Sequence, residues 1–137
     1  MEHLRVSAGH LFLIVSVEFP IFADILLSNF TINVEILKSI ITKKVKAIIS
    51  VDVNGRGCDY VKLHEICKKY NLKLITDSAE ALGSMYKKKY LGTYGDCGCF
   101  SFSAAKSIST GQGGMIVTNN KKIYLRLLEL KDQGRRF

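Results

Sequence analysis

Residues Cys97–Asn120 read CGCFSFSAAKSISTGQGGMIVTNN, and this stretch decides the interpretation of the fold. Alternating phenylalanines predict a strand over Cys99–Ser103, and an apolar run predicts another over Met115–Thr118. Between them, Gly113-Gly114 lets the backbone turn. The first strand therefore delivers Lys106 to the edge of a sheet.

Lys106 is the only charged residue of this stretch, whereas most lysines of the chain occur in runs. Small, hydroxylated and apolar neighbours solvate an ammonium group poorly, so we expect a lowered pKa for Lys106. Its neutral amine is then a candidate Schiff-base nucleophile. The alternative is a loop lysine whose stem packs on apolar neighbours while the amine reaches water.

The composition bounds the class of protein. The chain has 137 residues and 47% hydrophobic content, which suits one packed domain or part of one. Its formal net charge is +8, but the positive residues form scattered runs with no RNA-binding or helix-turn-helix pattern. We therefore expect an anionic small substrate and no nucleic acid. The four cysteines form no CxxC pair, so we expect no metal site, no disulfide framework and a reducing compartment.

The apolar segment Leu11–Leu27 does not read as a membrane span, because it contains Glu18, Pro20 and Asp24. The N-terminus lacks the small-residue cleavage motif of a signal peptide. We therefore expect a cytoplasmic protein with no membrane partner.

The rest of the chain alternates between strand-like and helix-like segments. We expect strands over Leu11–Val17, Ile21–Ile25, Val45–Val53 and Leu72–Thr76, and a hairpin over Tyr86–Leu91. We expect helices from Asn33 to Ile41, over Tyr60–Tyr70 with a cap at Asn71, and over Lys121–Gln133 with a buried stripe of Ile123, Leu127 and Leu130. This alternation is typical of an α/β fold, a mostly parallel sheet flanked by helices and joined by right-handed crossovers.

Several polar groups fall at the carboxyl ends of the expected strands, where open parallel sheets bind their ligands. Asp77 follows one strand, the turn residues Val53–Gly57 follow another, and Lys106 follows a third. Ser101 and Ser103 lie close to the same edge.

A lone lysine, a carboxylate and hydroxyls together suit pyridoxal 5'-phosphate (PLP). Lys106 would bind the aldehyde, Asp77 would keep the pyridine nitrogen protonated, and hydroxyls and backbone amides would hold the phosphate. Taken singly, Asp77 also fits a turn residue or a helix cap. Ser103-Ala104-Ala105-Lys106 also matches the S-x-x-K pattern of serine acyl transfer, although no S-D-N or K-T-G accompanies it.

A longer series of motifs resembles a known family. Ile75–Gly83 reads ITDSAEALG, Gly95-Asp96 forms a turn, and Phe100–Thr118 contains Ser-Phe-x-x-x-Lys and then Thr-Gly-x-Gly-Gly. This order resembles the DegT/DnrJ/StrS family of PLP-dependent sugar-nucleotide aminotransferases. The resemblance implies that residues 19–137 are part of the large PLP-binding domain of the aspartate-aminotransferase-like fold, without the small C-terminal domain. Residues 1–18 do not match.

The resemblance also implies roles for individual residues. Lys106 would be the catalytic Schiff-base lysine and proton carrier, Asp77 would bind the pyridine nitrogen, and Ser101 would contact the phosphate. Glu80 takes the place beside the ring and its 3-hydroxyl, and glutamate there is closest to the perosamine-synthase-like branch. Lys106 argues against the dehydratase branch, in which histidine replaces this lysine.

The implied reaction transfers an amino group, with glutamate as the expected donor, to a nucleotide-linked keto-sugar in cell-surface polysaccharide biosynthesis. The full-length family implies a homodimer. Two family features cannot be placed in this chain: a phosphate-binding helix N-terminus and an aromatic residue that stacks on the ring. The alternative is therefore a truncated, catalytically inactive remnant of such an enzyme, or a subunit that pairs with a separately encoded piece.

Overall fold

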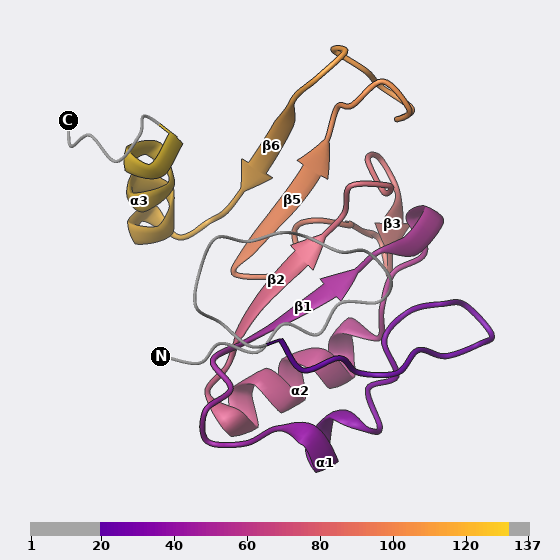
Figure 1. The fold of residues 1–137 in the computed structure, drawn as a ribbon, viewed down its shortest axis with the longest axis vertical. Coiled ribbons are helices and arrows are strands. Elements are labelled where there is room, and N and C mark those ends of the chain that lie inside the picture. The colour runs from indigo at the N-terminus through magenta and orange to yellow at the C-terminus, as the bar shows by residue number, and fades with distance from the viewer. Residues whose placement is uncertain (1–19, 132–137) are drawn as a thin grey trace.

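The computed structural model describes residues 20–131, which form a sheet with helices beside it (Figure 1). The segment 1–18 and the strand expected over Leu11–Val17 lie outside these residues. The main sheet has the order β1-β2-β5-β6. Its strands are β1 Ala47–Val51, β2 Lys73–Asp77, β5 Cys97–Ser101 and β6 Gly114–Val117. The first three are parallel and β6 is antiparallel to β5, so the expected mostly parallel sheet is confirmed.

The other elements are short, apart from two helices. They are α1 Leu37–Ile40, the 3₁₀ helix η1 Val53–Gly55, α2 Tyr60–Tyr70, the hairpin strands β3 Met85–Tyr86 and β4 Lys89–Tyr90, and α3 Lys121–Lys131. The predicted hairpin is confirmed, and Lys87 and Lys88 at its tip both have positive φ. Positive φ at both central residues is the geometry of a type I′ turn.

The core lies between the sheet and α2. In β1 and β2 every second residue is buried, as expected for strands with one face against a helix layer. Helix α2 has the bounds that the sequence predicts and buries a stripe that includes Leu63 and Ile66. Asp59 caps its start by accepting the Lys62 N–H at 3.2 Å, and Asn71 ends it in the left-handed conformation.

Two expectations before β1 are wrong. Instead of a strand over Ile21–Ile25, only an isolated bridge joins Ile25 to Ile32. Instead of a helix from Asn33 to Ile41, only α1 forms. The Asp24 side chain accepts the N–H of Ile25, and the Asn33 side chain accepts the N–H of Glu35. Such local hydrogen bonds satisfy the backbone in turns and compete with strands and helices.

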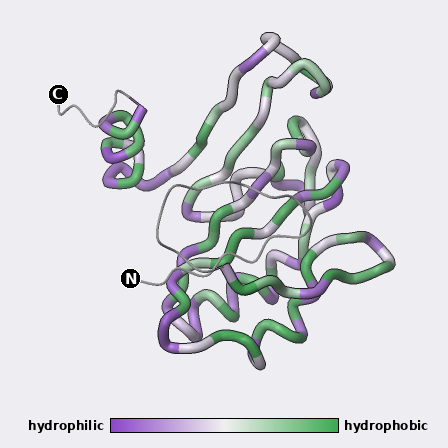
Figure 2. Tube along the Cα trace, in the orientation of Figure 1, coloured by the Kyte–Doolittle hydropathy of each residue, from purple (hydrophilic) through white to green (hydrophobic). Residues whose placement is uncertain are grey.

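Helix α3 projects away from the sheet (Figure 1). It alternates hydrophobic and hydrophilic residues (Figure 2), yet none of its residues is buried. Ile123 and Leu127 are half-buried and Leu130 is 55% exposed, so the expected buried stripe is wrong for the described residues. An amphipathic pattern predicts which face can be buried but does not supply the surface that buries it.

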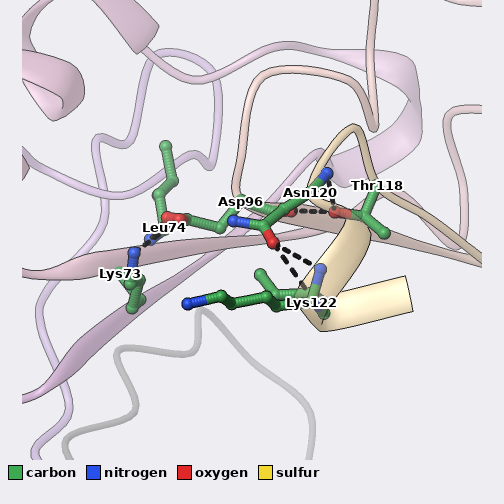
Figure 3. Close-up of polar contacts among 7 residues, drawn as sticks. Lys73, Leu74, Asp96, Thr118, Asn120 and Lys122 are labelled. Atoms are coloured by element: carbon green, nitrogen blue, oxygen red, sulfur yellow. Dashed lines mark hydrogen bonds and ion pairs between the residues drawn. The ribbon is translucent and has the colours of Figure 1, made fainter. Parts of the chain in front are cut away.

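Asp96 joins the start of β2 to the segment between β6 and α3 (Figure 3). Its carboxylate accepts the Lys73 ammonium and the Leu74 N–H, each at 2.9 Å, and its carbonyl accepts the Thr118 hydroxyl at 2.6 Å. Thr118 in turn accepts the Asn120 N–H, and the Asn120 side chain accepts two N–H groups of the first turn of α3. The Gly-Asp turn of the sequence motif is thus a structural junction.

Gly98 in the middle of β5 lies against the backbone of the loop that precedes the strand. A Cβ atom at this position would lie 1.8 Å from the Gly92 carbonyl oxygen. No side chain fits that gap, so the close approach of the two backbones requires glycine.

A bilayer-spanning segment is not found among the helices of residues 20–131, because none is both long and apolar enough.

Candidate active site

A cavity of about 330 Å³ opens between η1, the turn after β2 and the loop after β5. Its lining residues are Asn54, Ala79, Glu80, Leu82, Ser101, Ala105, Lys106, Ser107 and Ile108. Strands β1, β2 and β5 point the same way (Figure 1), so these segments follow their carboxyl ends. The volume lies at the small end of the range for small-molecule sites, about 300–1,000 Å³.

Lys106 lies in the loop after β5 and extends its side chain into this cavity. The loop turns where the Lys106 N–H donates to the Ser103 carbonyl at 3.0 Å. The Lys106 side chain is 24% exposed, and its Nζ lies 3.8 Å from Glu80 Oε1. By contrast, the ion-paired side chain of Lys62 on α2 is 52% exposed. The lysine singled out by the sequence is thus partly enclosed.

Glu80 is fixed from the opposite side. Its Oε2 accepts the backbone N–H of Asn54 at 3.1 Å, while Oε1 faces Lys106. Asn54 adopts the left-handed conformation, with φ 50° and ψ 38°. Asparagine tolerates this region better than most residues. One carboxylate therefore joins the loop after β1 to the loop after β5.

The two serines differ in position. Ser101, the last residue of β5, lines the cavity, whereas Ser103 is not among the lining residues. Ser101 Oγ accepts the Ser103 N–H, and the two hydroxyl oxygens are 3.3 Å apart. Of these two serines, only Ser101 lines the cavity together with Lys106.

Asp77 ends β2 next to this cavity but is not one of its lining residues. Its Oδ1 accepts the Ala79 N–H at 3.1 Å, as in the turn role that the sequence left open. Asp77 pairs with Cys99 in the register of β2 and β5. Because side chains alternate along a strand, Asp77 and Ser101 share one face of the sheet. The structure thus brings Lys106, Glu80 and Ser101 together and leaves Asp77 beside them.

The sequence analysis missed Asp52, the residue directly after β1. It is completely buried and accepts the Tyr60 hydroxyl at Oδ1 and the Ser78 hydroxyl at Oδ2, both at 2.6 Å. Burial raises the pKa of Asp52, and the hydrogen bonds from Ser78 and Tyr60 oppose that rise. The available signal was its place at the same sheet edge as Asp77.

Comparison with known proteins shows the family to which the chain belongs. The model of the DegT/DnrJ/EryC1/StrS aminotransferase family matches residues 12–137. The chain belongs to this family. A similar family member is the GDP-perosamine synthase of Escherichia coli O157:H7, which is 47% identical over 115 residues. That alignment covers 84% of this chain and 32% of the synthase, so the chain spans about a third of this relative.

Solved structures of similar proteins share the fold. The aminotransferase from Psychrobacter cryohalolentis superposes with a TM-score of 0.89 at 29% identity, over 99% of this chain and 36% of that protein. A GDP-4-keto-6-deoxymannose-3-dehydratase with a trapped PLP-glutamate geminal diamine has a TM-score of 0.84 at 29% identity. That match covers 97% of this chain and 36% of the dehydratase.

The donor set of the cavity suits the cofactor of this family. PLP needs an amine for its aldehyde, hydrogen-bond donors for its phosphate and polar groups around the ring. Lys106 would supply the amine and Ser101 a hydroxyl, while Glu80 and, directly at the end of β2, Asp77 would supply carboxylates. The residues present therefore fit the group.

Proposed function

We propose that this chain acts in a PLP-dependent sugar aminotransferase, with Lys106 as its catalytic lysine. The observation that carries the proposal is the enclosure of the Lys106 amine beside Glu80 and Ser101, at the carboxyl ends of parallel strands. In open α/β sheets this edge is where ligands bind.

The four residues divide the tasks in this proposal. Lys106 Nζ would hold the cofactor and would also carry the proton to and from the reacting carbon of the substrate. Asp77 holds a proton at the pyridine nitrogen, Ser101 donates to the phosphate, and Glu80 lies beside the ring. When bound, PLP supplies the electron sink that makes removal of the substrate proton possible.

We further propose glutamate as the amino donor and a nucleotide-linked keto-sugar as the acceptor, in the biosynthesis of a cell-surface polysaccharide. The PLP-glutamate adduct of the dehydratase supports the donor, and the similarity to a GDP-perosamine synthase supports a sugar of the perosamine type. We also propose a cytoplasmic enzyme, as the sequence features lead us to expect, and a homodimer, as the family resemblance implies.

The test is cofactor capture at a single lysine. PLP is added to the purified protein, the visible spectrum is recorded, and borohydride reduction followed by peptide mapping finds the modified residue. We expect labelling at Lys106 that Lys106→Ala abolishes. Lys62→Ala is the matched control, because it removes another lysine that pairs with a glutamate, at 2.5 Å. Capture at one site in Lys106→Ala would refute the assignment, and no capture in the unmodified chain would favour the inactive alternative.

The competing S-x-x-K reading is less well supported. That pattern places its serine at the start of a helix. Residues 103–108 instead form turns and bends, and Ser103 does not line the cavity. We expect Ser103→Ala to retain capture of PLP, and a β-lactam not to label Ser103.

A further inference from the structure

Asp52 is the one buried carboxylate among the described residues, and the proposed reaction does not use it. Each of its oxygens accepts a hydroxyl, from Tyr60 at the start of α2 and from Ser78 directly after β2. Burying a carboxylate costs free energy that apolar side chains of similar size would not require. Core stability alone therefore does not account for an acid at this position.

Three hydrogen bonds connect the loop after β1 to the last residue of β2 and the turn that follows it. The Asp52 N–H donates to the Asp77 carbonyl at 2.8 Å, and the Ser78 hydroxyl donates to Asp52 Oδ2 at 2.6 Å. The Asn54 N–H donates to Glu80 Oε2 at 3.1 Å. These bonds hold the segment that carries both Asp77 and Glu80.

The geometry points to Asp52 as a positioning residue that, through Ser78, fixes the turn presenting Glu80 to Lys106. The Ser78 carbonyl accepts the Ala81 N–H at 2.9 Å, so the same residue that binds Asp52 also closes the turn around Glu80. The claim that this positioning assists catalysis rests on the proposed function. The hydrogen bonds and the turn exist without a cofactor.

Two variants distinguish a positioning role of Asp52 from a role in core packing alone. Ser78→Ala and Tyr60→Phe each remove one hydroxyl that donates to Asp52, and both residues are buried, with exposures of 0% and 1%. Only Ser78→Ala cuts the connection to the turn. Tyr60→Phe retains the ring that stacks on Tyr94 with centroids 4.2 Å apart.

The primary measurement is amide hydrogen exchange in the protein without cofactor. We expect Ser78→Ala to speed exchange at Asn54, Ala79 and Ala81 by roughly tenfold to a hundredfold, the change that loss of a hydrogen bond to a charged group gives. In Tyr60→Phe these three amides should keep their rates. Equal acceleration in both variants, spread over β1 and α2, would show a purely structural role and overturn the proposal. Unchanged rates in Ser78→Ala would also overturn it.

Capture of PLP at Lys106 is the second readout. Ser78→Ala should capture less than Tyr60→Phe when both are compared at equal folded fraction. If the unmodified chain captures none, the proposed function fails, and the exchange rates still decide the role of Asp52. If it captures PLP and Ser78→Ala captures as much as Tyr60→Phe, the proposed function stands and the positioning role fails.

Discussion

The carboxylate of Glu80 has two partners: it accepts the backbone N–H of Asn54 and pairs with the amine of Lys106. Its side chain is 38% exposed and that of Lys106 is 24% exposed. Ion pairs with this much access to water contribute about 0–1 kcal/mol to stability. The pair is therefore better explained by the orientation of Lys106 than by stability of the fold.

Asp77→Asn is expected to separate catalysis from cofactor capture. The substitution preserves the shape of the side chain but removes the charge that would keep the pyridine nitrogen protonated. Transfer of the amino group should fall by about a hundredfold or more, as when an electrostatic group of an active site is removed. Borohydride trapping at Lys106 should persist. Parallel loss of both would contradict this role.

Cys58 is expected to be the least reactive thiol of the chain. It is completely buried, and burial raises the pKa of its thiol to about 12. Because the thiolate is the reactive form, labelling by Ellman's reagent near pH 8 should be about a hundredfold or more slower than in the unfolded chain. The raised pKa favours the protonated folded state, so this contribution to stability is present below pH 9.0 and is lost as the pH rises toward 12.

The control for this experiment is Cys97, which is only half-buried. It should react before Cys58 in the native protein and at a similar rate in guanidinium chloride. Native Cys58 that reacts as fast as Cys97 would contradict the buried position.

At the scale of elements, the two longer helices have similar sequence patterns and different environments. Both α2 and α3 have 11 residues. Helix α2 buries four of its residues, whereas α3 buries none. An isolated helix of this length is marginal in water, so the capping residue before α3 matters more for the helix itself than for the rest of the chain.

Two capping variants test this difference. Asn120→Ala removes the side-chain acceptor at the start of α3, and Asp59→Ala removes the one at the start of α2. Each cap contributes about 1 kcal/mol. We expect Asp59→Ala to lower the free energy of global unfolding by that amount in urea, and Asn120→Ala to speed exchange only at the amides of α3. Equal global destabilisation by both would show that α3 is part of the cooperative unit.

Sequence reasoning succeeded where the signals of an element are local. For α2, the apolar stripe and the capping Asn71 lie within or beside the helix, and its bounds are confirmed. It failed where the partners are distant in the chain. Asp52 contacts Ser78 across 26 residues, which no local pattern indicates. The sequence pattern of α3 likewise does not show whether another element packs on its apolar face, and none of its residues is buried. For the site, the spaced motifs led to Lys106, Glu80 and Ser101, but not to the Asn54 N–H that holds Glu80.

On the scale of the whole molecule, apolar side chains are exposed on β6 and α3. Ile116 is 48% exposed, and β6 has a strand partner on one side only within residues 20–131. Hydrophobic residues run along both elements (Figure 2). Open strand edges with apolar side chains favour self-association.

Ile116→Lys is therefore expected to reduce self-association, measured by sedimentation velocity over a range of protein concentrations. Val61→Lys on α2 is the matched control, because Val61 is 47% exposed and the substitution adds the same charge. We expect a clear fall in the associated fraction for Ile116→Lys alone. An equal fall in both variants would indicate a general effect of net charge instead.

The contact between Gly98 and Gly92 has a consequence for mutational scanning of this family. Because a Cβ atom at residue 98 would lie 1.8 Å from a backbone oxygen, every replacement there must push two chain segments apart. In a growth-based screen, residue 98 will therefore score as intolerant as Lys106, although Gly98 is not among the residues that line the cavity. Intolerance alone does not identify a chemical role, and only a separate measurement of protein abundance will distinguish the two positions.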